Sequence, residues 1–135
     1  RKVRAKSRCL SADVTSCFDP TFPDVYEKFN SAKISCGVCI NKFTGAGGKS
    51  GANDASAELM GEIRQIFAKA NIVWQAAELG VVDLGGGGTI AKFVASLNID
   101  TVDIGVPVIS MHAPYELISK ADLYTCYQAF CAFVK

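Results

Sequence analysis

One segment constrains the fold of this chain more than any other: the apolar run Val102–Met111. It is rich in Val and Ile and carries a single charged residue, Asp103. A run of this kind is typical of a buried β-strand, and Pro107 within it suggests an edge position or a bulge. A buried strand needs neighbouring elements on both of its faces, so the chain must build a sheet that other layers cover.

Shorter strand patterns recur earlier in the chain. The predicted strands are Cys9–Val14, Ile34–Phe43 and Ile72–Trp74. Helical patterns stand between them. Apolar residues repeat at helical spacing from Ala55 to Ala70, after Asn53 or Asp54 as the expected cap. This alternation predicts an α/β fold with helices packed on a sheet.

Two more helices are predicted towards the end of the chain. Thr89–Leu97 follows the glycine run Gly85–Gly88, which cannot hold a regular element. The last helix starts at Ser119 and Asp122, which fit a capping box. One face of it is lined by Leu123, Tyr127, Phe130, Cys131 and Val134.

The composition excludes several classes of function. Half of the 135 residues are apolar and the formal net charge is +1, so no nucleic-acid-binding footprint is visible. The basic residues at the start, Arg1 to Arg8, alternate with small or apolar ones and are expected to be exposed. No apolar run reaches the roughly 18 residues of a membrane span. No secretory signal pattern opens the sequence, and we expect a cytoplasmic protein.

The chain has six cysteines, at positions 9, 17, 36, 39, 126 and 131. Cys36 and Cys39 have the spacing of a redox or zinc motif. They lie within a strand pattern, however, and no second pair exists to complete a zinc site. Buried structural cysteines in a reducing compartment are the favoured interpretation.

A second motif, Gly48-Lys49-Ser50, resembles part of a phosphate-binding loop. That loop needs a glycine five residues before its Gly-Lys pair, and Phe43 occupies the position. A turn is therefore expected, and a nucleotide-binding module at Gly45–Gly51 is disfavoured. The run Gly85–Gly88 could receive an anion on its N–H groups, although that pattern alone is weak.

Two residues stand at strand ends, where clefts open in α/β folds. His112, the single histidine, ends the run Ile109–His112, and Asp13 ends Leu10–Asp13. Imidazole and carboxylate both suit Zn²⁺, but a zinc site normally takes at least three protein ligands. The residues alone leave open whether either side chain binds metal.

The motifs and their order resemble the aminopeptidase I family of zinc metallopeptidases, which includes the aspartyl aminopeptidases. The motifs are Leu10-Ser11-Ala12-Asp13, Asp19-Pro20-Thr21-Phe22, Gly87-Gly88-Thr89-Ile90, Val102-Asp103-Ile104-Gly105-Val106-Pro107, Ser110-Met111-His112-Ala113 and Tyr115-Glu116. The resemblance implies that residues 1–135 form a single domain, the C-terminal part of the catalytic domain. It also implies a three-layer sandwich around a mixed, mostly parallel sheet.

The resemblance further implies a two-zinc peptidase site. Asp13 would bind one zinc ion and His112 the other, and the two ions would activate a water for peptide hydrolysis. The family's other His ligand, bridging Asp and Glu-Glu pair have no counterpart, because this chain has no second His and no adjacent glutamates. We therefore expect the chain to be inactive alone.

Two positions depart from the family pattern. Ser16 stands where the family often has a His, and the substrate-contacting Lys aligns with Asn41, next to Lys42. Lys42, Gly88 and Thr89 are the expected substrate-side residues, the last two from the position of their loop. Family members form large homo-oligomers, so the alternative is a non-catalytic remnant that self-associates through exposed strand edges.

Overall fold

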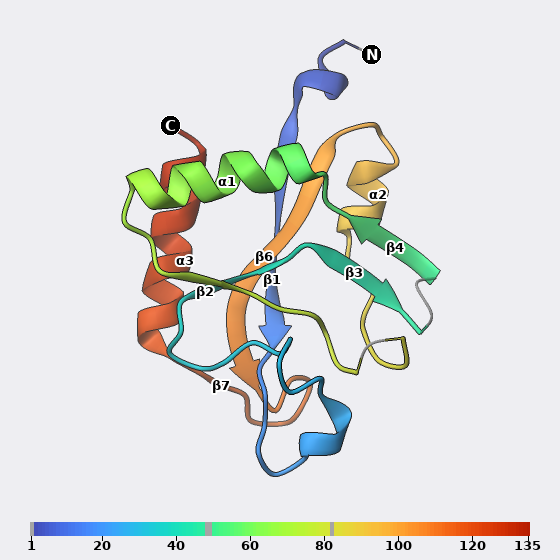
Figure 1. Ribbon diagram of the computed structural model, residues 1–135, viewed down its shortest axis with the longest axis vertical. Coiled ribbons are helices and arrows are strands. Elements are labelled where there is room, and N and C mark those ends of the chain that lie inside the picture. Colours follow the sequence, from blue (N-terminus) through green and yellow to red (C-terminus); the bar gives the residue numbers. More distant parts are fainter. Residues whose placement is uncertain (1, 48–49, 82) are drawn as a thin grey trace.

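The computed structural model of the chain describes residues 2–47, 50–81 and 83–135 (Figure 1). Its central sheet has the strand order β1 (Arg8–Ser16), β6 (Asp100–Ile109), β2 (Val38–Asn41) and β5 (Trp74–Ala76). A short strand, β7 (Leu117–Ile118), also pairs with β6. β1 runs parallel to β6 and β5 parallel to β2, whereas β6 is antiparallel to β2 and β7. The predicted α/β class with a central mixed sheet is confirmed.

Successive side chains of β6 point alternately to the two opposite faces of the sheet. Val102, Ile104 and Val106 belong to the main apolar core, which also holds residues of helices α1 (Ala57–Lys69) and α3 (Lys120–Phe133). The intervening Asp103 points to the opposite side, where its carboxylate meets residues of the loop before α2 (Ala91–Ala95) and of β3 (Phe43–Ala46). β3 pairs with β4 (Ser50–Asp54) in a separate two-stranded ribbon. Figure 1 shows α1 and α3 on one side of the view and α2 with the ribbon on the other.

Pro107 does not mark an edge, because β6 lies in the middle of the sheet. The proline falls between the stretch that pairs with β2, Asp103–Gly105, and the stretch that pairs with β7, Val108–Ile109. Its missing N–H therefore interrupts neither antiparallel ladder.

The predicted strand Ile34–Phe43 is wrong at its start and is divided at Lys42. Ser35 and Gly37 have positive φ values of 63° and 92°, so residues 34–37 turn before β2 begins. A Cβ on Gly37 would lie 2.3 Å from the Val73 carbonyl oxygen, which requires glycine there. Cys36 is exposed in this turn and Cys39 is buried in β2. Of these two cysteines, Cys39 alone is buried as the pattern predicted.

Both predicted helix caps, at the starts of α1 and α3, need correction. α1 begins after Ser56, whose Oγ accepts the Leu59 N–H at 3.2 Å, while Asn53 and Asp54 lie in β4. Ser119 does precede α3, but it makes no side-chain cap bond. The Asp122 carboxylate accepts from a distant turn instead. The capping-box prediction was therefore wrong.

The sides of the helices that face the core are formed by few residues. α1 buries Leu59, Ile63 and Phe67, as its spacing predicted. α3 buries Asp122, Cys126 and Ala129. Of the predicted apolar face of α3, Leu123, Tyr127 and Val134 are exposed, whereas Phe130 is partly buried and packs against the core.

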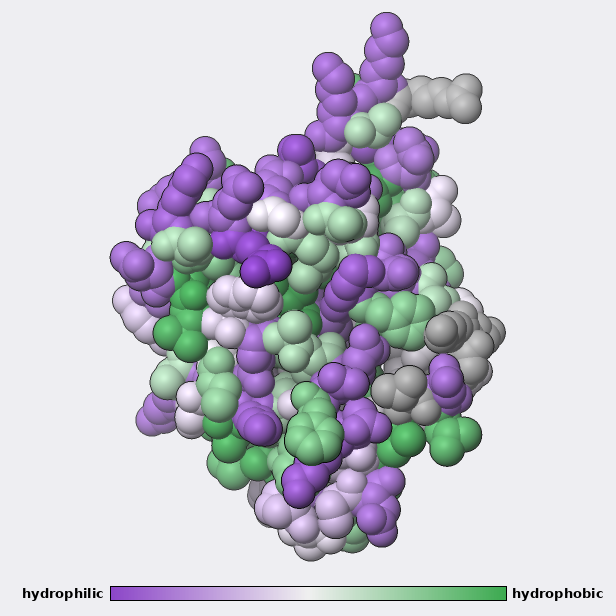
Figure 2. Space-filling model, viewed as in Figure 1, coloured by the Kyte–Doolittle hydropathy of each residue, from purple (hydrophilic) through white to green (hydrophobic). Residues whose placement is uncertain are grey.

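The start of the chain is exposed and polar. Lys2, Arg4 and Lys6 lie around the 3-10 turn η1 (Arg4–Lys6), where Figure 2 shows hydrophilic residues gathered at the top of the molecule. A second 3-10 turn, η2, spans Pro23–Val25. Across the described ranges, no helix is both long and apolar enough to cross a membrane. Gly48 and Lys49, the centre of the Gly-Lys-Ser motif, lie outside the described residues.

Candidate metal and substrate site

Asp13 lies on β1, beside Gly105 of β6. A Cβ at position 105 would lie 1.8 Å from the Asp13 carbonyl oxygen, so only glycine allows the two strands to approach this closely. The Asp13 side chain is exposed, and its Oδ1 accepts the N–H of Val14 at 2.8 Å. The carboxylate is thus held by its own strand and is open to a partner from outside the chain.

His112 lies in the loop that joins β6 to β7. Ser110 and His112 both have left-handed φ values, 61° and 67°, which are uncommon for residues other than glycine. The His112 N–H donates to Glu116 Oε1 at 2.6 Å, which closes the loop across its base. His112 is exposed. Backbone of this kind often occurs at functional positions.

The strands β1 and β6 are parallel and their carboxyl ends coincide. Asp13 does not end its strand as predicted, because it lies within β1 opposite Gly105, whereas His112 follows the end of β6. Asp13 comes three residues before Ser16, the last residue of β1, and His112 three residues after Ile109, the last of β6. Within the described ranges, no three His, Cys, Asp or Glu side chains gather closely enough to hold a metal ion. The two donors suit zinc by type, and they are fewer than the three protein ligands that a zinc site normally takes.

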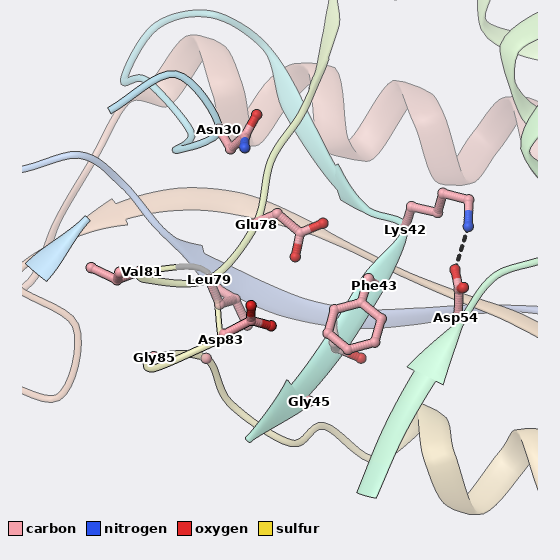
Figure 3. Close-up of a pocket in the computed structure, with 12 residues that line it drawn as sticks. Asn30, Lys42, Phe43, Gly45, Asp54, Glu78, Leu79, Val81, Asp83 and Gly85 are labelled. Atoms are coloured by element: carbon pink, nitrogen blue, oxygen red, sulfur yellow. Dashed lines mark hydrogen bonds and ion pairs between the residues drawn. The ribbon is translucent and has the colours of Figure 1, made fainter. Parts of the chain in front are cut away.

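Lys42 lines a pocket of about 400 Å³ together with Phe43, Gly85 and Gly86 (Figure 3). Its ammonium forms an ion pair with Asp54 across β3 and β4. In Figure 3, Phe43 stands between this pair and the carboxylates of Glu78 and Asp83. Lys42 therefore reaches a pocket bordered by the glycine loop.

Asn41, the position where the family pattern has its lysine, is not available for ligands. Its side chain is buried in β2, and Nδ2 donates to the Ala77 carbonyl at 2.7 Å. The one-residue difference between Asn41 and Lys42 decides which face a side chain takes. Of the two residues, Lys42 is the one at the pocket.

Thr89 holds the glycine loop in place through its hydroxyl, a role that the Gly-Gly-Thr-Ile motif did not predict. Its hydroxyl donates to Asp103 Oδ2 at 2.9 Å, and the Thr44 hydroxyl donates to the same oxygen at 2.8 Å. Gly86, with φ 102°, packs so closely on β3 that a Cβ would lie 2.2 Å from the Gly45 carbonyl oxygen. Gly88 remains exposed beyond these contacts. Thr89 thus anchors the loop, and Gly88 presents backbone to the surface.

Asp103 is the residue of this region whose role the sequence reasoning missed. It is 3% exposed, and its Oδ1 has no hydrogen-bond partner in the part of the chain that the structure describes. The available signal was its position as the one carboxylate in an otherwise apolar strand. Such a group must find donors when it is buried, and the donors here are the two threonines.

The buried cysteines are poor metal ligands or nucleophiles. Burial raises the pKa of the Cys39 thiol to about 12 and that of the Cys17 thiol to about 11. Metal binding and nucleophilic attack both need the thiolate. Cys39, the second cysteine of the Cys-Gly-Val-Cys segment, is therefore poorly suited to either role.

Known proteins match the chain along its whole length. The family model for aminopeptidase I zinc metalloprotease (M18) matches residues 1–134. A probable M18 family aminopeptidase 1 from Clostridium acetobutylicum is 48% identical over 134 residues, and one from Borreliella afzelii is 50% identical over 135. The chain covers 29% and 30% of these two relatives, so it spans about a third of the length of the proteins it matches.

Solved structures show the same fold. The crystal structure of aminopeptidase I from Clostridium acetobutylicum matches 97% of this chain with a TM-score of 0.92, and 29% of that protein is covered. The M18 aminopeptidase from Thermotoga maritima matches 99% with a TM-score of 0.95 at 40% identity, over 30% of its own chain. By sequence and by fold, this chain belongs to the M18 family of aminopeptidase I zinc metalloproteases.

Proposed function

We propose that this chain supplies two metal ligands to a two-zinc aminopeptidase site, Asp13 for one ion and His112 for the other. The observation that carries the proposal is that both residues are exposed, Asp13 in the second half of β1 and His112 in the loop that follows the parallel strand β6. A bound zinc pair would polarise the scissile carbonyl and activate water. The substrate would be a peptide, whose N-terminal residue is removed.

The chain by itself would not be a peptidase. It has five glutamates, none adjacent to another, and His112 is its single histidine, so the family's general base and remaining ligands must come from other residues. We assign Lys42 and Gly88 to the substrate side, from the pocket beside the glycine loop and the exposed loop backbone. We place Thr89 with them as the residue that fixes this loop on Asp103.

The test is an aminopeptidase assay on the purified 135-residue chain with added Zn²⁺, using aminoacyl-p-nitroanilide substrates that cover acidic, basic and apolar residues. We expect no release above a metal-only control. Zinc-dependent release that disappears in Asp13→Asn would show that the chain carries a complete site. That result would overturn the proposal that it supplies only part of one.

A second function, self-association, is favoured by one observation. Within the described part of the chain β1 pairs with β6 alone, so nine residues of this strand present an edge without a strand partner there, and Ala12, Asp13 and Val14 of β1 are exposed. Long open edges pair readily with another strand. Light scattering on the purified chain should show dimers or larger species, and a single monomeric species at high concentration would exclude this function.

A further inference from the structure

Lys92, in the short helix α2, has an unusual position for a surface lysine. Its side chain is partly buried, and a Cβ added to Gly51 or Gly88 would lie 3.1 Å or 3.5 Å from its Nζ. The ammonium also lies 5.0 Å from the centre of the Phe93 ring. The side chain is therefore folded back over two glycines instead of extending into water.

This ammonium has no counter-charge within the described ranges. The ion pairs found there are Arg8–Glu62 and Lys42–Asp54, and Lys92 is in neither. No hydrogen bond of its side chain to a described residue occurs either. Partial burial weakens hydration of a charge, so an unpaired ammonium in this position favours a bound anion.

The adjoining glycine loop offers free donors. The N–H of Gly85 donates to the Val81 carbonyl at 2.7 Å. Those of Gly86, Gly87 and Gly88 donate to no acceptor in the described part of the chain. The loop is nevertheless fixed in place, by the close contact of Gly86 with Gly45 and by the Thr89–Asp103 hydrogen bond. Donors that are held in place without partners are suited to an external acceptor.

We propose that Lys92 and the glycine loop 86–88 form a binding site for an oxyanion, a carboxylate or a phosphate group. Lys92 would supply the positive charge and the loop the N–H groups that have no acceptor among the described residues, the combination that oxyanions require. The buried Asp103 carboxylate makes no ion pair with Lys92, and its Oδ2 accepts from the hydroxyls of Thr44 and Thr89. The more specific assignment, that the anion is the carboxylate of a peptide, rests on the proposed function.

The site is tested by two-dimensional ¹⁵N NMR on the metal-free chain, titrated with sodium phosphate or sodium acetate at an ionic strength held constant with chloride. The amides of Gly86, Gly87 and Gly88 should shift saturably with at least one of these anions. Lys92→Gln should weaken binding at least 10-fold, while Lys92→Arg, which keeps the charge, should preserve it. Lys69→Gln, an exposed lysine at the end of α1, is the matched control and should bind as the wild type does.

Loop amides that do not shift, or that shift equally in Lys92→Gln and the wild type, would overturn the site. A second titration compares Ala-Ala with its C-terminal amide. Saturable shifts with the free dipeptide alone would support the peptide carboxylate, and shifts with phosphate alone would overturn that assignment while leaving the oxyanion site. No metal is present, so this result is independent of the zinc-dependent assay.

Discussion

At the scale of single residues, Gly105 sets the distance between the two strands that carry the candidate ligands. It lies beside Asp13, and its missing side chain leaves room for the Asp13 carbonyl. A methyl group there would force β1 away from β6 and would displace Asp13 with it. The glycine is therefore a requirement of the proposed metal edge as well as of the sheet.

Gly105→Ala should lower the free energy of unfolding by about 3 kcal/mol, at the upper end of the range for overpacked cores. Urea denaturation followed by circular dichroism measures the change. Gly61→Ala is the matched control, since Gly61 lies in α1 with nothing within 4 Å of its added Cβ. This control should stabilise the chain by about 0.5–1 kcal/mol. Equal stabilities for Gly105→Ala and the wild type would contradict the steric argument.

Asp122 joins two parts of the chain that are far apart in sequence. It is 1% exposed, and its carboxylate accepts the N–H of Ser35 at 2.7 Å and that of Gly37 at 2.8 Å. The sequence placed Asp122 in a capping box, because local spacing shows only local partners. Its actual partners are 87 and 85 residues away, and no short-range pattern reveals them.

Asp122→Ala should destabilise the chain by about 3 kcal/mol, because two backbone N–H groups lose their acceptor. Asp24→Ala, at an exposed aspartate in η2, should change stability by less than about 0.5 kcal/mol. Hydrogen exchange at Gly37 should accelerate in the first variant only. A Gly37 amide that stays as protected as in the wild type would show that Asp122 does not hold this turn.

At the scale of elements, periodicity predicted what is buried better than where an element ends. The apolar run that starts at Val102 predicted β6. The spacing of Leu59, Ile63 and Phe67 predicted the face of α1 that packs on the core. The turn at Ser35 was missed, because a residue with positive φ is not visible as a pattern of apolar residues. The start of α1 depends on one hydrogen bond, which the Leu59 N–H donates to Ser56 Oγ, and Asn53 and Asp54 are equally good caps by residue type.

Packing of α1 on the sheet depends on Phe67, which is fully buried and lies edge-on to Trp74 at a ring-centre distance of 6.4 Å. Phe67→Ala should cost about 3–5 kcal/mol, as is usual for a buried aromatic residue. The fluorescence of Trp74, the only tryptophan, reports the unfolding directly. Phe29→Ala, at a residue that is 91% exposed, should leave the midpoint of the unfolding transition unchanged. A shift of similar size in both variants would contradict the described core.

The buried Cys39 thiol in β2 makes the stability of the chain depend on pH. Because burial raises the pKa of Cys39 from its ordinary value of 9.0 to about 12, the folded chain keeps this proton at pH values above 9, where the unfolded chain releases it. The contribution to stability is complete below pH 9 and falls as the pH rises towards 12. In denaturation experiments at several pH values, Cys39→Ala should lose less stability between pH 9 and pH 12 than the wild type. Cys36→Ala, at an exposed thiol, should lose as much as the wild type. An unchanged pH dependence in Cys39→Ala would contradict the assignment.

At the scale of the whole molecule, the chain presents the proposed ligands Asp13 and His112 on a well-defined core. The α/β class followed from the alternation of patterns, because each buried element leaves its own period in the sequence. The assignment of Asp13 and His112 to one metal site did not follow from the spacing of apolar residues. It depended on the resemblance to the family. Lys92 was missed altogether, since the contact of its ammonium with Gly51 and Gly88 exists only after folding.

The most direct test of the account is a chimera in which this chain replaces the matching 134 residues of the Clostridium acetobutylicum relative. The account predicts zinc-dependent removal of N-terminal residues by the purified chimera. It also predicts a loss of about 100-fold or more for both Asp13→Asn and His112→Asn, at least the loss typical of disturbed metal sites. Asp24→Asn should keep full activity. An active chimera in which either ligand variant retains the activity of its parent would contradict the assignment of Asp13 and His112 to zinc.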